Sequence, residues 1–314
     1  MQDRLTQTTS HLLMIRPVRF GFNEQTAEDN AFMHNGGQHA PGEIRRLAQQ
    51  EFDRFVAMLR QAGITVTVFE DTPEPHTPDS IFPNNWVSFH EQGKIIIYPM
   101  HAPNRRDERR SDIVAHFQAM YQHPPQVIDL SFFEQEGKYL ESTGSMVMDR
   151  VHQRVYACYS PRTTPELFES FCREVNAQGY LFHAVDAQGV EIYHTNVMMA
   201  IGTRFAVVCL EAIHDSEERE ALVQRLSETG HEVVPITYAQ MNQFAGNMLQ
   251  LYTYEGQPLL VMSRRAFASL RPDQVASLQG YTELLVIPLD VIETYGGGSV
   301  RCMMAEVFLD GANA

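Results

Sequence analysis

The sequence predicts an α/β protein built from five similar ββαβ units around a pseudo-five-fold axis, in the manner of a propeller. Three observations support this: a segment that recurs about every fifty residues, a helix in each unit, and strands at the two ends of the chain that can pair. The 314 residues are 44% hydrophobic and 20% charged, which is typical of a globular protein. No linker rich in Gly, Pro or Ser divides the chain, so we predict one domain over residues 1–314.

A polar residue followed by a short apolar strand, often rich in methionine, recurs five times. The segments begin at Asn85, Ser145, Asn196, Asn247 and Arg301, so successive starts differ by 60, 51, 51 and 54 residues. A fixed period in this range is typical of propellers and solenoid-like arrays. The alternative that stays open is an open α/β sheet assembled from unrelated βα units.

Each unit continues with a stronger strand and then a helix. The strongest strands are β-branched or aromatic and lie between turn residues; they are residues 95–98, 155–159, 205–209 and 259–262. An apolar stripe with helical spacing predicts a helix over residues 43–62. Thr164 is the predicted N-cap of a helix that ends at Gly179, and Asp215 that of a helix that ends at Gly230. A C-terminal strand at 302–308 should pair beside a strand at 12–18, which closes the ring and removes exposed sheet edges.

Charge and composition narrow the function classes. The net charge of −15 argues against nucleic-acid binding, and the basic patch Arg105-Arg106 beside Arg109-Arg110 is interpreted as a solvated helix face. The sequence contains no run of about 18 apolar residues, so no membrane span is predicted. Met1–Arg4 is polar and lacks the apolar core of a leader peptide. The cysteines lie at 158, 172, 209 and 302 without a CxxC motif, so neither a zinc site nor a disulfide framework is expected. The lack of a disulfide framework among the cysteines leads us to expect a reducing, cytoplasmic compartment.

Four reactive side chains lie near the starts of different repeats: Asp79, Glu141, His194 and Cys302. Each has a structural explanation when taken alone, since a cysteine is often a small core residue and a glutamate is often a surface charge. Together they supply a thiol, an imidazole and carboxylates at equivalent positions, which should converge near the axis. This convergence favours a catalytic site.

The chemistry requires this combination of groups. Cys302 attacks as a thiolate, which a protonated His194 stabilises before it delivers the proton to a leaving amine. Glu141 orients the imidazole and favours its charged form. Asp79 holds the NH donors of a planar guanidino or ureido group. Gly296–Gly298 lets the backbone pass close to the substrate and lets a loop close over it.

These motifs resemble the guanidine-modifying, or pentein, superfamily over essentially the whole chain. Glu141-Ser142-Thr143-Gly144 stands where the family often has Glu-Gly-Gly-Asp, and His194-Thr195-Asn196 stands where many members have His-x-Asp. The segment 296–302 matches the family's glycine-rich approach to the nucleophile. The segment 78–86 looks most like the bacterial branch labelled amidinotransferase or citrulline-utilisation hydrolase. The resemblance implies a five-fold α/β propeller that needs no metal and no cofactor.

Two departures from the family pattern affect the expected substrate. Gly144 and Asn196 replace acidic residues, so only Asp79 is left as a carboxylate for the head group. One carboxylate fewer suits a neutral ureido group such as that of citrulline, and Asn196 can both donate to it and accept from it. Arg301, Asn23 and Arg16 are candidates for binding the polar end of the substrate.

The sequence therefore predicts a hydrolase that cleaves a C–N bond of a small ureido or guanidino substrate through a Cys302 adduct, with citrulline favoured. The alternatives are an amidinotransferase, in which an amine replaces water, and an arginine- or dimethylarginine-type deiminase. A third is a non-enzymatic binding protein, because the resemblance also extends to translation initiation factor six. A small-molecule partner is expected rather than a membrane, and a homo-oligomer stays open.

Overall fold

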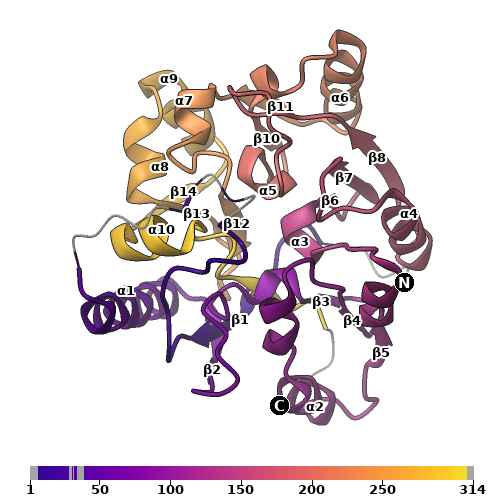
Figure 1. The fold of residues 1–314 in the computed structure, drawn as a ribbon. Coiled ribbons are helices and arrows are strands. Elements are labelled where there is room, and N and C mark those ends of the chain that lie inside the picture. Colours follow the sequence, from indigo (N-terminus) through magenta and orange to yellow (C-terminus); the bar gives the residue numbers. More distant parts are fainter. Residues whose placement is uncertain (1–5, 28–29, 31, 34–38, 310–314) are drawn as a thin grey trace. The chain divides into compact units, whose positions relative to one another are not determined.

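The computed structural model describes residues 6–27, 30, 32–33 and 39–309 (Figure 1). Met1–Arg4, which carries the prediction about a leader peptide, lies outside these residues. The chain forms two compact units. The first contains Thr143–Pro288 and Ser299–Arg301, with the described residues up to Thr8; the second contains Thr9–Ser142, Leu289–Gly298 and the chain from Cys302 onward. Within the described ranges, no helix is both long enough and apolar enough to cross a membrane.

Five three-stranded sheets with one shared topology organise the described residues. In each, the first strand pairs antiparallel with the second, and the second pairs parallel with the third. At least one helix lies in the chain between the second and third strands, as a parallel connection requires. Each sheet is therefore a ββαβ unit, and the predicted α/β propeller class is confirmed.

The first unit of the chain contains three of these sheets. Its strands are β6 (Met146–Asp149), β7 (Arg154–Cys158), β8 (Gln178–Phe182), β9 (Met199–Ile201), β10 (Phe205–Val208), β11 (Glu232–Pro235), β12 (Leu249–Tyr252), β13 (Pro258–Ser263) and β14 (Glu283–Ile287). Its helices are α4 (Pro165–Glu174), α5 (Thr195–Met198), α6 (Ser216–Glu228), α7 (Tyr238–Met241), α8 (Arg264–Ser269) and α9 (Pro272–Gln279). The opening strand β9 contacts the opening strands β6 and β12. Residues that directly precede these three strands in the first unit are therefore expected to lie near one another.

The second unit contains the other two sheets. Its elements are β1 (His11–Arg16), α1 (Pro41–Gln61), β2 (Thr65–Glu70), β3 (Val87–His90), β4 (Lys94–Ile97), α2 (Ser111–Ala119), β5 (Gln126–Asp129), α10 (Asp290–Gly296) and β15 (Ala305–Glu306). The short helix α3 (Ser142–Ser145) lies where the two units meet in sequence. Figure 1 shows α1 beside β1 and β2, and its apolar stripe is buried from Ile44 to Leu59. The opening strands β15 and β3 contact each other.

The two ends of the chain share one sheet, as predicted. Leu12 pairs with Glu306 and Leu13 with Ala305 in an antiparallel ladder. The predicted strand over 302–308 is shorter than expected, because Cys302 lies in a turn before β15. A core of buried side chains from Leu13, Trp86, Phe89, Phe117 and other residues fixes this sheet against that of β3 and β4.

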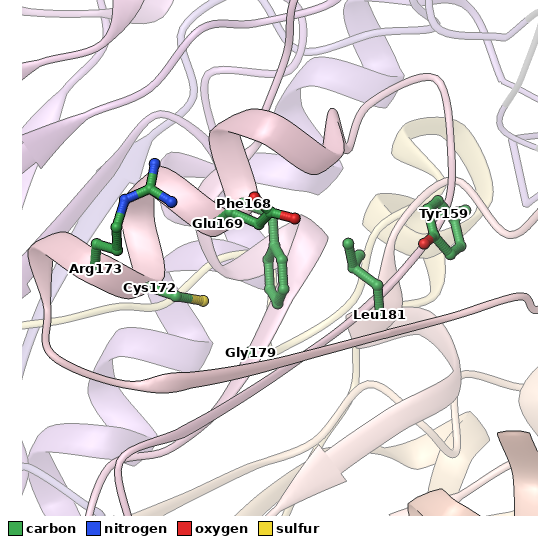
Figure 2. Close-up of a pocket in the computed structure, with 7 residues that line it drawn as sticks. All are labelled: Tyr159, Phe168, Glu169, Cys172, Arg173, Gly179 and Leu181. Carbon is green, nitrogen blue, oxygen red and sulfur yellow. The ribbon is translucent and has the colours of Figure 1, made fainter.

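One predicted helix end is wrong. The helix that follows Thr164 ends at Glu174, and Gly179 lies within β8. A Cβ atom on Gly179 would lie 2.5 Å from the Phe168 ring and 2.9 Å from the sulfur of Cys172, so the glycine is explained by close packing of α4 on β8. Figure 2 shows these side chains around a cavity of about 440 Å³. None of the predicted site residues lines that cavity.

Candidate active site

Asp79 is a buried carboxylate that is only partly satisfied. It is 3% exposed and lies in the loop between β2 and β3. Its Oδ2 accepts hydrogen bonds from Asn23 Nδ2 at 2.7 Å and from Thr26 Oγ1 at 3.1 Å. Its Oδ1 has no hydrogen-bond partner among the described residues. A buried acceptor without a partner is costly, so this oxygen is available to a ligand.

Arg105 corrects the interpretation of the basic patch as a solvated face. Its side chain is 3% exposed, in a 3-10 helix over Pro103–Glu108. Its guanidinium makes a two-pronged contact with Glu108, with Nε 2.8 Å from Oε1 and Nη2 2.9 Å from Oε2. It also lies 3.8 Å from Asp79 and 3.9 Å from Glu141. One buried cation therefore joins two of the predicted site residues.

Opposing effects set the charges in this cluster. Burial alone disfavours a charged Arg105, but Glu108, Asp79 and Glu141 outweigh burial and hold the pKa of the guanidinium above its usual value. Burial raises the pKa of Glu108, and Arg105 opposes that rise. Because one cation serves three carboxylates, part of the negative charge of Asp79 is neutralised within the protein.

Asn85 is a further candidate site residue, which the sequence analysis did not single out although it starts the first repeat. Its Oδ1 accepts from Arg105 Nη1 at 2.9 Å, which fixes the orientation of the amide. Its Nδ2 is buried, with no acceptor among the residues that the structure describes. The surroundings of Arg105 thus hold an unused acceptor on Asp79 and an unused donor on Asn85.

Glu141 is fully buried and held by the backbone. Its Oε1 accepts from the backbone N–H of His101 at 2.9 Å, which fixes the direction of the carboxylate. The next residue, Ser142, has a φ of 43°, a left-handed conformation that is uncommon for residues other than glycine. The family motif has glycine at this position, which relieves that strain. Departures of this kind cluster at functional sites.

The glycine run before Cys302, which was expected to let a loop close over the substrate, is buried. Gly297, with a φ of 62°, ends α10, and a Cβ atom on it would lie 2.4 Å from Met33. A Cβ atom on Gly298 would lie 2.7 Å from the Phe82 ring. Phe82 itself donates its backbone N–H to the Asp79 carbonyl at 2.9 Å. The run therefore packs on the turn that carries Asp79.

His194 lies in the first unit as the N-cap residue of α5. Its neighbours fix its backbone: Thr195 Oγ1 donates to the carbonyl of Ser145 at 2.6 Å and accepts from the N–H of Cys158 at 2.8 Å. These bonds tie the start of β9 to the second repeat of the chain. His194 is 3% exposed.

Asn247 joins the two other predicted residues of the first unit and is a second residue that the sequence analysis missed. Its Nδ2 donates to the Asn196 carbonyl at 3.0 Å, and its Oδ1 accepts from the Arg301 N–H at 3.0 Å. Gly246 allows this approach, because a Cβ atom there would lie 2.2 Å from the carbonyl oxygen of Val197. Asn247 thereby sets the backbone of the residue before Cys302.

Two of the three candidates for the polar end of the substrate, Asn23 and Arg16, differ in their surroundings. Asn23 is buried beside Asp79 and lines a cavity of about 280 Å³ together with Gln25, His76 and Asn104. The guanidinium of Arg16 is instead engaged by Asp53 at 2.8 Å and Glu70 at 3.0 Å. Asn23 is therefore better placed than Arg16 to meet a ligand.

The other thiols are structural. Burial raises the pKa of Cys158 and Cys172 to about 12 and that of Cys209 to about 11. At pH 8 each is a thiolate in fewer than about one molecule in a thousand. We expect iodoacetamide to label the native protein at Cys302 first, as peptide mapping by mass spectrometry would show. Earlier labelling of any of the other three would contradict this assignment.

Fold and sequence together define the class: the chain is a cysteine-dependent enzyme of the guanidine-modifying, or pentein, superfamily. A family model described as N,N dimethylarginine dimethylhydrolase, eukaryotic, matches residues 16–309, so the chain belongs to that family. No curated protein matches the chain.

Several solved structures share the fold. The N-terminal domain of ArgZ, an arginine dihydrolase from cyanobacteria, in a mutant bound to substrate, aligns with a TM-score of 0.73 and 13% identity over 95% of this chain and 99% of that one. Unliganded AgrE aligns at 0.74 and 16%, over 97% of this chain and 40% of that one. A mutant of DDAH from Pseudomonas aeruginosa complexed with citrulline aligns at 0.64 and 15%, over 96% and 100%. At these identities the likeness establishes the fold.

Proposed function

We propose that the chain hydrolyses a C–N bond in the head group of a small ureido or guanidino amino acid, with citrulline as the favoured substrate. The buried polar atoms around Arg105 carry the substrate assignment. Asp79 Oδ1 needs a donor and Asn85 Nδ2 needs an acceptor. A ureido group supplies both through its NH₂ and its carbonyl oxygen, whereas a guanidinium can only donate.

In the proposed reaction the Cys302 thiolate adds to the ureido carbon, and His194 protonates the amine as the C–N bond breaks. With citrulline, ornithine leaves and a carbamoyl group stays on the sulfur. Water, deprotonated by His194, then displaces the thiolate and gives carbamate, which decomposes to carbon dioxide and ammonia. Glu141, buried and fixed by the His101 N–H, is proposed to orient the imidazole.

Hydrolysis of arginine or dimethylarginine is a second candidate, favoured by two observations. Three carboxylates surround one guanidinium at Arg105, and the excess negative charge suits a cationic head group. The matching family is also described as a dimethylarginine dimethylhydrolase. In this case ammonia or dimethylamine would leave, and the product would be citrulline.

Initial rates with citrulline, arginine, dimethylarginine and agmatine, with products identified by mass spectrometry, test both candidates. We expect the highest kcat/KM with citrulline, with ornithine as the product. If citrulline accumulates as a product of arginine or dimethylarginine and is not consumed, the second candidate holds. Addition of acceptor amines, with a search for transferred product, tests the amidinotransferase alternative.

Substitution Asn196→Asp tests charge selectivity. A carboxylate at this position can only accept, so it should disfavour a ureido oxygen and favour a guanidinium. We expect the ratio of kcat/KM for citrulline to that for arginine to fall by at least about tenfold, which corresponds to about 1.4 kcal/mol. The matched control is Asn242→Asp, just after α7. An unchanged ratio in Asn196→Asp would remove Asn196 from the selectivity determinants.

A further inference from the structure

A cluster of one aspartate and two histidines lies in the first unit, outside the proposed active site. Asp149 ends β6, His152 lies in the turn to β7, and His231 precedes β11. One ligand atom from each lies within 4.8 Å of the others. Asp149 and His231 are buried, at 1% and 5% exposed, and Asp149 has His152 as an ionic partner at 2.9 Å.

The distances suit a small ion. His152 Nδ1 donates its proton to the carboxylate oxygens of Asp149 at 2.9 Å, and a metal ion would take the place of that proton; His231 Nδ1 lies 4.0 Å from Oδ2 of the same residue. Ligands at 2.0–2.2 Å from a tetrahedral ion lie roughly 3.3 Å from one another. Closing the set therefore needs small shifts only. His152 can supply them, because it lies in a turn and its side chain is 37% exposed.

The hydrogen bonds of His231 leave the correct nitrogen for a metal. Its Nε2 lies 3.1 Å from the carbonyl oxygen of Gly202, so Nε2 carries the proton and Nδ1, which faces Asp149, keeps its lone pair. Thr229 Oγ1, 2.8 Å from Nδ1, can turn its proton to the Leu226 carbonyl at 2.9 Å instead. Metal-binding histidines usually bind the metal through one ring nitrogen and donate the N–H of the other to a backbone carbonyl or a carboxylate.

We propose that Asp149, His152 and His231 bind a divalent transition-metal ion, with Zn²⁺ as the type case. Two imidazoles and a carboxylate suit zinc, nickel, copper or cobalt better than calcium or magnesium, which prefer oxygen ligands. Three protein ligands leave at least one position to water. The ion fastens the β6–β7 turn to the connection between α6 and β11, and so stabilises the first unit.

This site is separate from the proposed catalytic residues. His194 precedes β9, whereas Gly202, which binds His231, directly follows that strand. Asp149 likewise ends β6, the strand that follows Glu141 and α3. Within the first unit, the metal cluster thus lies at the opposite end of β9 from His194.

The proposal is tested by titrating the chelator-treated full chain with Zn²⁺. Calorimetry measures the affinity and stoichiometry, and the Tm of thermal unfolding measures the stabilisation. We expect one ion per chain that raises Tm, and an affinity that falls by more than about 10–100-fold in His152→Ala, because loss of a ligand costs more than loss of its support. His183→Ala is the matched control, since His183 pairs with Glu218 at 2.9 Å in a similar exposed contact. Cys302→Ser tests whether the ion binds the thiolate of Cys302 instead of the cluster; we expect this variant to bind Zn²⁺ as the wild type does.

Cobalt provides an independent readout. Co²⁺ bound at the cluster should show d–d bands without the thiolate charge-transfer band that binding at Cys302 would add. Zn²⁺ affinity equal to wild type in His152→Ala, or binding no tighter than about millimolar in the wild type, would overturn the proposal. So would a loss of the ion in Cys302→Ser.

Discussion

Replacement of Cys302 by serine is expected to lower kcat by on the order of 10⁴- to 10⁶-fold, while the fold is retained. A hydroxyl at this position is a far weaker nucleophile than a thiolate, and it cannot form the thiol-bound intermediate. Product formation under saturating substrate, together with circular dichroism and Tm, checks the result.

Cys209→Ser is the matched control for this variant. Cys209 is a fully buried thiol with a pKa raised by burial, directly after β10. We expect it to lose about 1–3 kcal/mol of stability and to keep its kcat. Turnover close to wild type in Cys302→Ser, or a loss of kcat confined to Cys209→Ser, would refute Cys302 as the nucleophile.

Substitution Arg105→Met should destabilise the protein by about 3–5 kcal/mol, because it leaves three buried carboxylates without their cation. The loss should be largest at high pH. Burial raises the pKa of Glu108, and Arg105 opposes that rise. In the variant the folded-state pKa of Glu108 should therefore lie still further above its pKa in the unfolded chain. Stability is then retained at low pH, where Glu108 is protonated, and is lost as the pH rises through the folded-state pKa. Urea unfolding at pH 5.5 and at pH 8 measures the difference.

Arg110→Met is the control for charge removal at the surface. Arg110 pairs with Asp112, whose side chain is 59% exposed, so the expected loss is below about 1 kcal/mol. The double variant Arg105→Met, Glu108→Leu should recover part of the stability, since it removes a carboxylate together with its partner. Equal losses in the two single arginine variants would show that Arg105 is not the cation of a buried cluster.

The fold was largely predictable because the repeat leaves a periodic pattern. Local hydrophobic spacing and capping chemistry predict the strand pairs, the helix over Pro41–Gln61 and the role of Asp215 as an N-cap residue. Local boundaries were less predictable. Asn196 begins a strand in the sequence pattern, but it lies in the helical turn α5, because the Thr195 side chain takes up backbone groups that a ladder would otherwise pair. Gly179 looks like a helix stop and is a packing glycine.

The sequence could point to candidate site residues only where the side chains themselves are reactive. Arg105 and Glu108 have the i, i+3 spacing of an ordinary surface pair, and nothing in that spacing reveals that both are buried. Asn85 and Asn247 stand at repeat starts, so the same alignment that selected Cys302 could have selected them. Their roles depend on bonds to distant backbone and side-chain groups, which one sequence does not display.

The central claim, a covalent Cys302 intermediate formed from a small ureido or guanidino substrate, is tested most directly by acid quenching during turnover. Peptide mapping of the quenched wild type should find an adduct on the peptide that contains Cys302: a carbamoyl group from citrulline, or a thiouronium that keeps the amino-acid chain from arginine or dimethylarginine. Cys302→Ser should show no adduct. Two results would contradict the mechanism. One is an adduct on another residue; the other is full turnover by both the wild type and Cys302→Ser with no adduct at Cys302.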